Sequence, residues 1–216
     1  MNKSMKRVAL VAALLSWLPF ASAQDTSISS PTQTQVREAI KSQLPAPPEG
    51  FAWQLYKNVV FLKPAAWNEQ EMTDNIAGIP YTTYATSPEE FSRVKQFEMG
   101  VTIQLISGSQ RIRGIPAKKL AVVYLKPFLD AHKKEEVLML EQSIQGDFER
   151  TFFRYRDAPP GLKPIIVHKF IVANNATDSV NIFTFESPAE TWNDNWAKYG
   201  TPIIAKLNVL PNIPAE

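Results

Sequence analysis

The chain has no cysteine, only two histidines and only eight glycines among its 216 residues. Without cysteine it can form no disulfide, no thiolate metal site and no thiol nucleophile, and its N-terminus cannot be lipid-modified on cysteine. Neither histidine has the neighbours of a known zinc motif, and no G-x-S-x-G elbow or glycine-rich phosphate loop occurs. We therefore expect no cofactor, no metal site and no set of catalytic residues.

The histidines have plainer interpretations. His132 follows Asp130 and precedes Glu135 and Glu136, where a helix is expected to end. A cationic side chain is favourable there, so we interpret it as a solvated helix end. His168 lies in an alternating strand pattern and is expected to be paired within a sheet.

Residues 1–23 have the pattern of a secretory signal peptide. Three cations lie within residues 3–7, residues 8–20 are almost wholly apolar, and Ala21-Ser22-Ala23 supplies the small residues of a cleavage site. The apolar run is shorter than the ~20 residues of a membrane span, although an uncleaved signal anchor is the alternative. We expect cleavage before Gln24 and a soluble periplasmic or secreted protein with no integral membrane segment.

The nearly neutral charge of the chain argues against a highly charged partner such as nucleic acid. The full chain has 23 basic and 21 acidic residues, and removing the three signal-peptide cations leaves 20 against 21, a net charge of −1. Such a balance gives no long-range attraction to nucleic acid. The expected partner is a protein or a small molecule, and its identity stays open.

Residues 24–50 are expected to form a flexible leader with one short helix. Val36, Ile40 and Leu44 fall at helical spacing, which predicts a helix over 34–44, and the proline-rich stretch 45–50 ends it. The main domain is expected to span 51–216.

The pattern of the main domain predicts strands, one helix, four strands and a last helix. Pro116 opens the first helix, in which Leu120, Val123, Tyr124 and Phe128 share one face, and Pro127 should kink it or end it early. The connection 68–75 is polar, and residues 87–90 suggest a helical turn. The expected strands are 52–58, 59–64, 78–86, 99–107, 136–145, 147–157, 163–173 and 179–187, with the turn between the first two at Lys57-Asn58. Four consecutive strands with short connections indicate an antiparallel meander, and hence an α+β fold.

The stretch FTFESPAETWNDNWAKYG, 183–200, combines acids with aromatic residues. Ser187, Pro188 and Glu190 have the spacing of a capping box, which predicts a helix start there. Trp192 and Trp196, one turn apart, would then form a packing face that Tyr199 continues.

The acids of this stretch also allow a second interpretation. A hydrolase could use Glu186, Glu190 or Asp194 beside the tryptophans. Glycosidase carboxyls flank a bound sugar with a gap of ~5–10 Å, a geometry that two side chains one helical turn apart do not readily supply.

Strand 147–157, DFERTFFRYRD, is the best binding candidate. If the strand is regular, Phe148, Arg150, Phe152, Arg154 and Arg156 share one face, and such arginines and aromatic rings could bind anionic or planar ligands. The alternative is that the arginines only lie along apolar neighbours or pair with acids. The candidate ligand-binding residues are Arg150, Phe152, Arg154, Arg156 and Trp196.

Several motifs resemble the PsbP-like family, which shares its fold with a Ran-binding nuclear import factor. They are FLKPAAW at 61–67, YATSPEEF at 84–91, the strand at 99–107, and the final strands followed by FESPAETWNDNW. The resemblance covers about residues 51–210 and implies an α/β/α sandwich with a central antiparallel sheet and flanking helices. It implies no catalytic residues, so the expected function is that of a non-enzymatic binding or accessory protein of the cell envelope.

Overall fold

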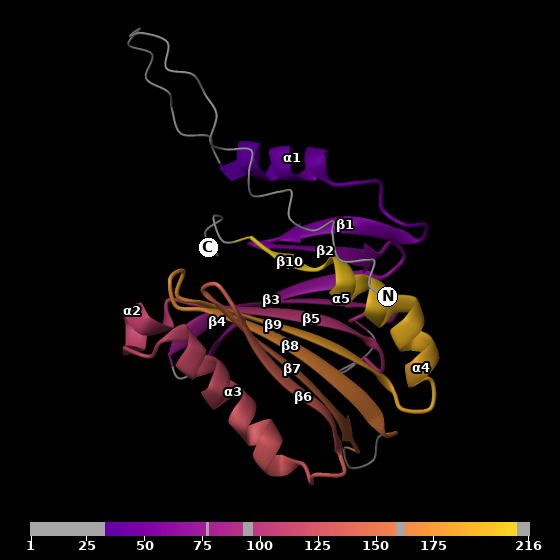
Figure 1. Ribbon diagram of the computed structural model, residues 1–216. Helices are drawn as coiled ribbons and strands as arrows, with labels where there is room; N and C mark the ends of the chain where they lie inside the picture. The colour runs from indigo at the N-terminus through magenta and orange to yellow at the C-terminus, as the bar shows by residue number, and fades with distance from the viewer. Residues whose placement is uncertain (1–32, 77, 93–96, 159–162, 211–216) are drawn as a thin grey trace, which may run out of the picture.

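The computed structural model describes residues 33–76, 78–92, 97–158 and 163–210. The predicted signal peptide, 1–23, lies outside the described residues. A seven-stranded antiparallel sheet forms the middle layer, with helix α3 on one face and a small sheet with helices α4 and α5 on the other (Figure 1). The predicted α+β sandwich with flanking helices is therefore confirmed.

The large sheet has the strand order β3-β4-β5-β9-β8-β7-β6. Its strands are β3 (Asn68–Ile76), β4 (Ile79–Ser87), β5 (Gly100–Ser107), β6 (Val137–Gln145), β7 (Phe148–Asp157), β8 (Ile165–Asn174) and β9 (Ser179–Pro188). The predicted meander is confirmed as β6 to β9. Strand β9 then pairs with β5, which joins the meander to the antiparallel strands β3, β4 and β5.

The outer layer on one face combines strands and helices. Strands β1 (Phe51–Tyr56) and β2 (Val59–Pro64) form the predicted hairpin, and Lys57 at its turn has a positive φ of 50°. Strand β10 (Asn208–Val209), which the sequence pattern did not predict, pairs with β2. Helix α4 (Trp192–Asn195) runs through a π-helical turn, η1 (Trp196–Gly200), into α5 (Thr201–Lys206).

Helix α3 (Ala117–Ala131) covers the opposite face and follows a short helix, α2 (Ser109–Arg113). Leu120 is buried as predicted, but Val123 is 53% exposed, so its assignment to the apolar face was wrong. Tyr124 and Phe128 are half-buried and pack against the core beneath the helix, as predicted, and the fully buried residues are Ala117, Leu120, Ala121 and Leu125. Pro127 lies inside the helix, which continues beyond it for one more turn.

Helix α1 (Gln33–Gln43) confirms the helix predicted for 34–44 and lies above β1 (Figure 1). The Arg37 guanidinium holds it there by donating to the backbone carbonyls of Leu55 and Lys57, at 3.1 and 3.3 Å. In this arrangement a part of the predicted leader belongs to the folded structure.

Two predictions about the connections were wrong. Residues 68–75 form strand β3, which pairs with β4 along its whole length although its side chains are exposed. A polar strand at a sheet edge buries neither face, so its sequence has no apolar alternation. Residues 87–90 form no helix, because Ser87 belongs to β4 and its hydroxyl accepts the backbone N–H of Glu89 at 3.0 Å.

The two faces of the large sheet carry separate cores, with alternate residues of each strand facing opposite sides. The first core, toward the small sheet and α4–α5, includes Phe61, Phe170 and Phe185. The second, beneath α3, includes Phe153 and Ile171. No helix within the described parts of the chain is long and apolar enough to span a membrane.

Candidate functional site

The regular pairing of β7 with β8 places the predicted binding residues on one face. Each residue from Phe148 to Asp157 pairs without a shift, so side chains alternate strictly between the two faces. Phe148 and Phe152 pack in the first core, whereas Phe153 and Tyr155 pack in the second. Arg150, Arg154 and Arg156 therefore lie on the first-core side, as the alternation predicted.

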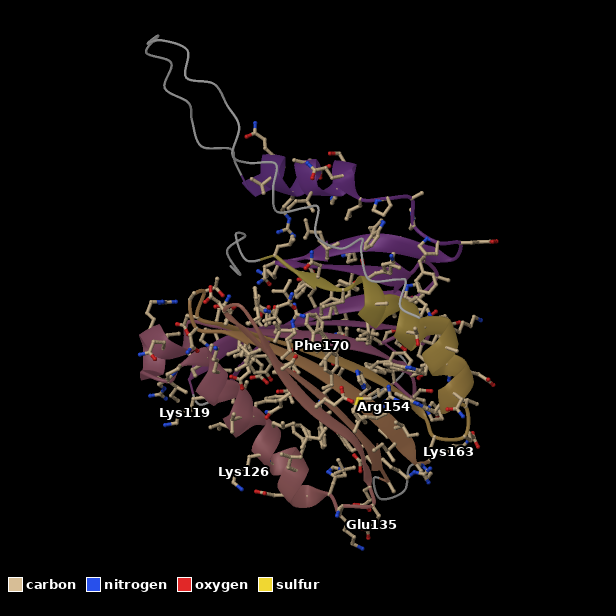
Figure 2. The ribbon with its side chains drawn as sticks, viewed as in Figure 1. Lys119, Lys126, Glu135, Arg154, Lys163 and Phe170 are labelled. Atoms are coloured by element: carbon tan, nitrogen blue, oxygen red, sulfur yellow. The ribbon has the colours of Figure 1, made fainter. Side chains whose placement is uncertain are left out.

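Arg154 is held against two tryptophans of the C-terminal helix. Its guanidinium carbon lies 4.3 Å from the ring centroid of Trp196 and 5.1 Å from that of Trp192. Figure 2 shows Arg154 between the large sheet and α4. A planar cation over an indole face is favoured by the ring quadrupole, and the contact is stronger where water is partly excluded. Burial also lowers the pKa of Arg154.

The tryptophans are positioned by each other and by the sheet. Their rings stack with centroids 5.2 Å apart at an interplanar angle of 15°, and each meets Phe185 edge-on. Trp192 is buried and Trp196 is half-buried. The packing face predicted for this pair is confirmed, and Trp196 presents its ring to Arg154.

His168 completes the group from the neighbouring strand. The Nε–H of Arg154 donates to His168 Nδ1 at 3.3 Å, and the imidazole lies 4.7 Å from the Trp196 ring. Burial and the nearby Arg154 charge lower the pKa of His168 to about 3, so the ring is neutral at physiological pH. Its Nε2 is buried without a hydrogen-bond partner among the described residues.

The other candidate residues of β7 lie in different environments. Phe152 stacks on Phe170 at 4.4 Å with nearly parallel rings and also lies beside His168. Arg150 is half-buried, and its Nε has no partner in the described part of the chain. Arg156 is exposed. The structure therefore brings Arg154, Trp196 and Phe152 together around His168, with Arg150 and Arg156 to either side along the strand.

The capping box predicted at Ser187 and Glu190 was wrong. Strand β9 extends through Pro188, because Ser187 pairs with Ile166 of β8, and α4 begins only at Trp192. Glu190 is exposed and forms an ion pair with Lys163 at 3.2 Å. The Ser187 hydroxyl accepts from the Asn195 amide at 2.7 Å, so it still contacts the helix, through a side chain of its first turn.

The three acids of the hydrolase alternative do not converge. Glu186 lies on the α3 face of the sheet, whereas Asp194 projects from α4 on the opposite side and is exposed. Glu190 is engaged by Lys163 at the surface. A pair of carboxyls flanking one substrate is not formed by these residues.

A second polar cluster, which the sequence patterns did not reveal, lies on the α3 face. Lys169 is 6% exposed, and its ammonium donates to the Thr184 hydroxyl at 3.1 Å. It also lies 4.6 Å from the ring of Phe128 and 5.7 Å from that of Tyr124. Burial lowers the pKa of Lys169 to about 8, although the charge of Glu186 opposes this effect.

Glu186 lies diagonally from Lys169 on the same face of the neighbouring strand β9, and its charge acts on this ammonium. Burial raises its pKa to about 7, because the low-dielectric surroundings disfavour the charged form more than Lys169 favours it. The signal that could have revealed the cluster is a lysine in the middle of IIVHKFIVA, a strand that is otherwise apolar on both faces.

His132 terminates α3 as predicted, but it is half-buried. Its Nδ1–H donates to the carbonyl of Phe128 at 2.7 Å, and its ring packs 4.3 Å from that of Tyr155. Across the described residues, no group of three or more His, Asp or Glu side chains is placed to hold a metal ion.

Comparisons with known proteins concern the fold. No protein-family model and no curated protein matches the sequence. The structure is similar to the solution structure of cyanobacterial PsbP from Synechocystis sp. PCC 6803, with a TM-score of 0.46 and 11% identity over 78% of this chain and 99% of that chain. It is also similar to the Ran-binding protein Mog1p of Saccharomyces cerevisiae, with a TM-score of 0.40 and 12% identity over 74% of this chain and 96% of that one.

A mutant of the protein Mog1 gives a TM-score of 0.38 and 11% identity over 74% of this chain and 96% of that chain. These are the two kinds of protein that the sequence resemblance names. At such identities the likeness says nothing of ligands or partners.

Proposed function

We propose that the chain is an exported, non-enzymatic binding protein. Its proposed binding site is the first-core face of β7, centred on Arg154 and Trp196, and the proposed ligand is an anionic group next to a planar or aromatic one. The observation that carries this proposal is the position of Arg154. Its guanidinium stacks on Trp196, and no carboxylate forms an ion pair with it among the described residues.

A half-buried cation without a counter-ion is unfavourable unless other groups offset the lost hydration. The two indole rings and the neutral His168 supply part of that offset. Only the Nε–H of the guanidinium is engaged by a side chain of the described residues. The remaining N–H groups suit a carboxylate, phosphate or sulfonate, which guanidinium groups bind in bidentate geometry.

Arg156 extends the same face toward solvent. Residues two apart on a strand lie about 7 Å apart, so a ligand longer than one anionic group could contact both arginines. Arg156 is exposed and forms no ion pair with a described residue. The part of the site that recognises planar groups is Phe152 and the half-buried Trp196.

The binding test uses anilinonaphthalene sulfonate, an anionic aromatic probe, titrated into the purified chain with fluorescence as the readout. Arg154→Met should weaken binding at least tenfold, while circular dichroism shows the fold to persist. Lys198→Met is the matched control, since Lys198 is an exposed cation stacked on Tyr199 of the same helix. Equal affinities for the wild type and Arg154→Met would overturn the proposed site.

The proposed export has a separate test. The full chain is expressed in a bacterium, cell fractions are separated, and the N-terminus of the recovered protein is sequenced. Cleavage before Gln24 and recovery outside the cytoplasm are expected. A protein that keeps residues 1–23 and stays in the cytoplasm would contradict this part of the proposal.

A further inference from the structure

The edge strand β6 is suited to pairing with a strand of another chain. Among the described residues only β7 pairs with it, so one side of its backbone has no strand partner there. Leu138, Leu140 and Ile144 are 49%, 48% and 72% exposed. Soluble proteins usually protect such an edge with charge, proline or a covering segment, because it can recruit another strand.

Strand β3, at the opposite edge of the same sheet, is acidic rather than apolar. Strand β3 carries three acids, Glu69, Glu71 and Asp74, and one exposed apolar residue, Met72. Like charges on facing strands repel, so two β3 edges should not pair with each other. Strand β6 carries one charge, Glu141, and no lysine, arginine or proline. A bulge interrupts it between Val137 and Met139, and beyond the bulge its pairing with β7 is regular.

We propose that β6 pairs antiparallel with β6 of a second copy of this chain, about a two-fold axis at Gln142. The register follows from charge and apolar matching. With Gln142 opposite its own counterpart, Leu140 faces Ile144 of the second copy, which buries both exposed side chains. In the same register Glu141 faces the small, neutral Ser143 rather than another Glu141.

This register also gives Arg150 a counter-ion. Arg150 pairs with Ser143 across the β7–β6 ladder, so these two residues lie in one row on the first-core face. Glu141 of the second copy continues that row, one strand beyond Ser143. A serine side chain leaves room for the long arginine to reach over it. Within one copy, Glu141 is only a diagonal neighbour of Arg150, and no ion pair between them is found among the described residues.

The dimer would join the two seven-stranded sheets into one continuous sheet. Its formation does not depend on the proposed ligand, because Arg154 keeps its contacts with Trp196 and His168. The second copy adds one residue to each row, and the row of Arg154 gains only the neutral Gln145, beyond Met139. The tests below therefore need no ligand.

The first test is the oligomeric state of the purified full chain, measured by sedimentation over a range of concentrations. We expect a concentration-dependent monomer–dimer equilibrium. Leu140→Lys with Ile144→Lys should raise the dissociation constant at least tenfold, whereas Met72→Lys on the other edge should leave it unchanged. A chain that is monomeric at every concentration, or a dimer insensitive to the β6 lysines, would overturn the proposal.

The second test uses the absence of cysteine. Directly opposite residues of antiparallel strands have Cα atoms about 4.5–5.5 Å apart, within the range of a disulfide. Gln142→Cys should therefore give a disulfide-linked dimer under mild oxidation. Gln145→Cys is the control, because its two copies would lie about 20 Å apart along the strands. Equal crosslinking of both variants would contradict the register.

The third test is a charge exchange. Arg150→Glu or Glu141→Arg alone should weaken the dimer, because each places like charges in one row. The double variant should restore it toward the wild-type dissociation constant. Additive weakening in the double variant would exclude the Arg150–Glu141 contact between copies.

Discussion

The carboxylate of Asp178 accepts the backbone N–H of Gln110, 68 residues away in the sequence, at 2.9 Å. It also accepts the N–H of Arg111 at 3.1 Å and the hydroxyl of Ser109 at 3.1 Å. A turn between β8 and β9 thus supplies the cap that Gly108, the residue before α2, cannot supply. This contact ties α2, and through it the start of α3, to the central strands.

Asp178→Ala should lower the free energy of unfolding by about 0.5–2 kcal/mol, the usual range for a lost cap. Asp178 also has a positive φ of 46°, a conformation that asparagine tolerates better than alanine. Asp178→Asn should therefore lose clearly less stability. Urea denaturation measures both variants, and exposed Asp194→Ala serves as the control. An Asp178→Ala variant as stable as the control would contradict the capping role.

The stability of the protein should depend on His168 at acid pH. Its folded-state pKa of about 3 lies below the ordinary 6.5, so the unfolded chain takes up a proton that the folded chain excludes. Stability from this group is complete above pH 6.5 and is lost as the pH falls toward 3. His168→Gln does not titrate, and its side-chain oxygen can still accept from Arg154.

The measurement is the difference in unfolding free energy between the wild type and His168→Gln at pH 7 and pH 5. The advantage of the wild type should shrink by on the order of 2 kcal/mol between these values. A difference that stays constant with pH would show that the imidazole does not resist protonation.

Lys169 and Glu186 should make the free energy of unfolding depend on pH in opposite directions. Lys169 has a folded-state pKa of about 8, below the ordinary 10.5, so its contribution to stability rises as the pH increases from 8 to 10.5. Glu186 has a folded-state pKa of about 7, above the ordinary 4.5, so its contribution falls as the pH increases from 4.5 to 7.

Replacing one partner at a time separates these trends. Glu186→Gln should gain stability relative to the wild type, by on the order of 1–3 kcal/mol, as the pH rises from 4.5 to 7. Lys169→Met should lack the rise above pH 8. Chemical denaturation at each pH measures both, and exposed Lys126→Met controls for the loss of a positive charge. If the unfolding free energies of the wild type and all three variants changed with pH in the same way, the shifted pKa values of Lys169 and Glu186 would be contradicted.

Gly200 is required by its contact with Trp196. It lies at the end of η1 with an ordinary helical φ of −59°, so its backbone needs no special freedom. A Cβ at this position would overlap the Trp196 ring, whose six-membered part faces it directly. Gly200→Ala should therefore destabilise the protein by about 1–3 kcal/mol, as overpacking does, although alanine is the better helix former.

Thermal unfolding, together with tryptophan fluorescence as a report on the ring, measures this effect. Ala197→Gly, at an exposed position in the same turn, should cost only about 1 kcal/mol through helix propensity. A Gly200→Ala chain that is more stable than the wild type would show that the indole moves aside freely.

The parts of the fold that were predictable are those in which one face of an element is apolar. Strand β7 alternates, and β8 and β9 are short runs rich in β-branched and aromatic residues between turn residues, which together indicate strands. The hairpin of β1 and β2 was predictable because Lys57-Asn58 separates two apolar runs. Strand β3 was not predictable, because it is held by backbone hydrogen bonds to β4. Its side chains are exposed and polar, so they show no apolar alternation.

The candidate site was predictable only in part. Successive side chains of a strand point to opposite faces, so the sequence predicts that Arg150, Phe152 and Arg154 lie on the same face. The contact of Arg154 with Trp196 depends on how the C-terminal helix folds back over the sheet, and no local pattern contains that information. The capping box failed for a related reason, because the pairing of Ser187 with Ile166 competes with the helix start and prevails.

His168 and Lys169 are consecutive residues of β8 that face different cores. A slip of this strand by one residue would turn every side chain to the other face. The ammonium of Lys169 would then meet the guanidinium of Arg154, and the imidazole of His168 would be set beneath α3 against Glu186. Each exchange is electrostatically unfavourable or leaves a buried group mismatched. Two polar residues in the middle of an apolar strand thus fix the register of β8, which hydrophobicity alone would leave free to slip.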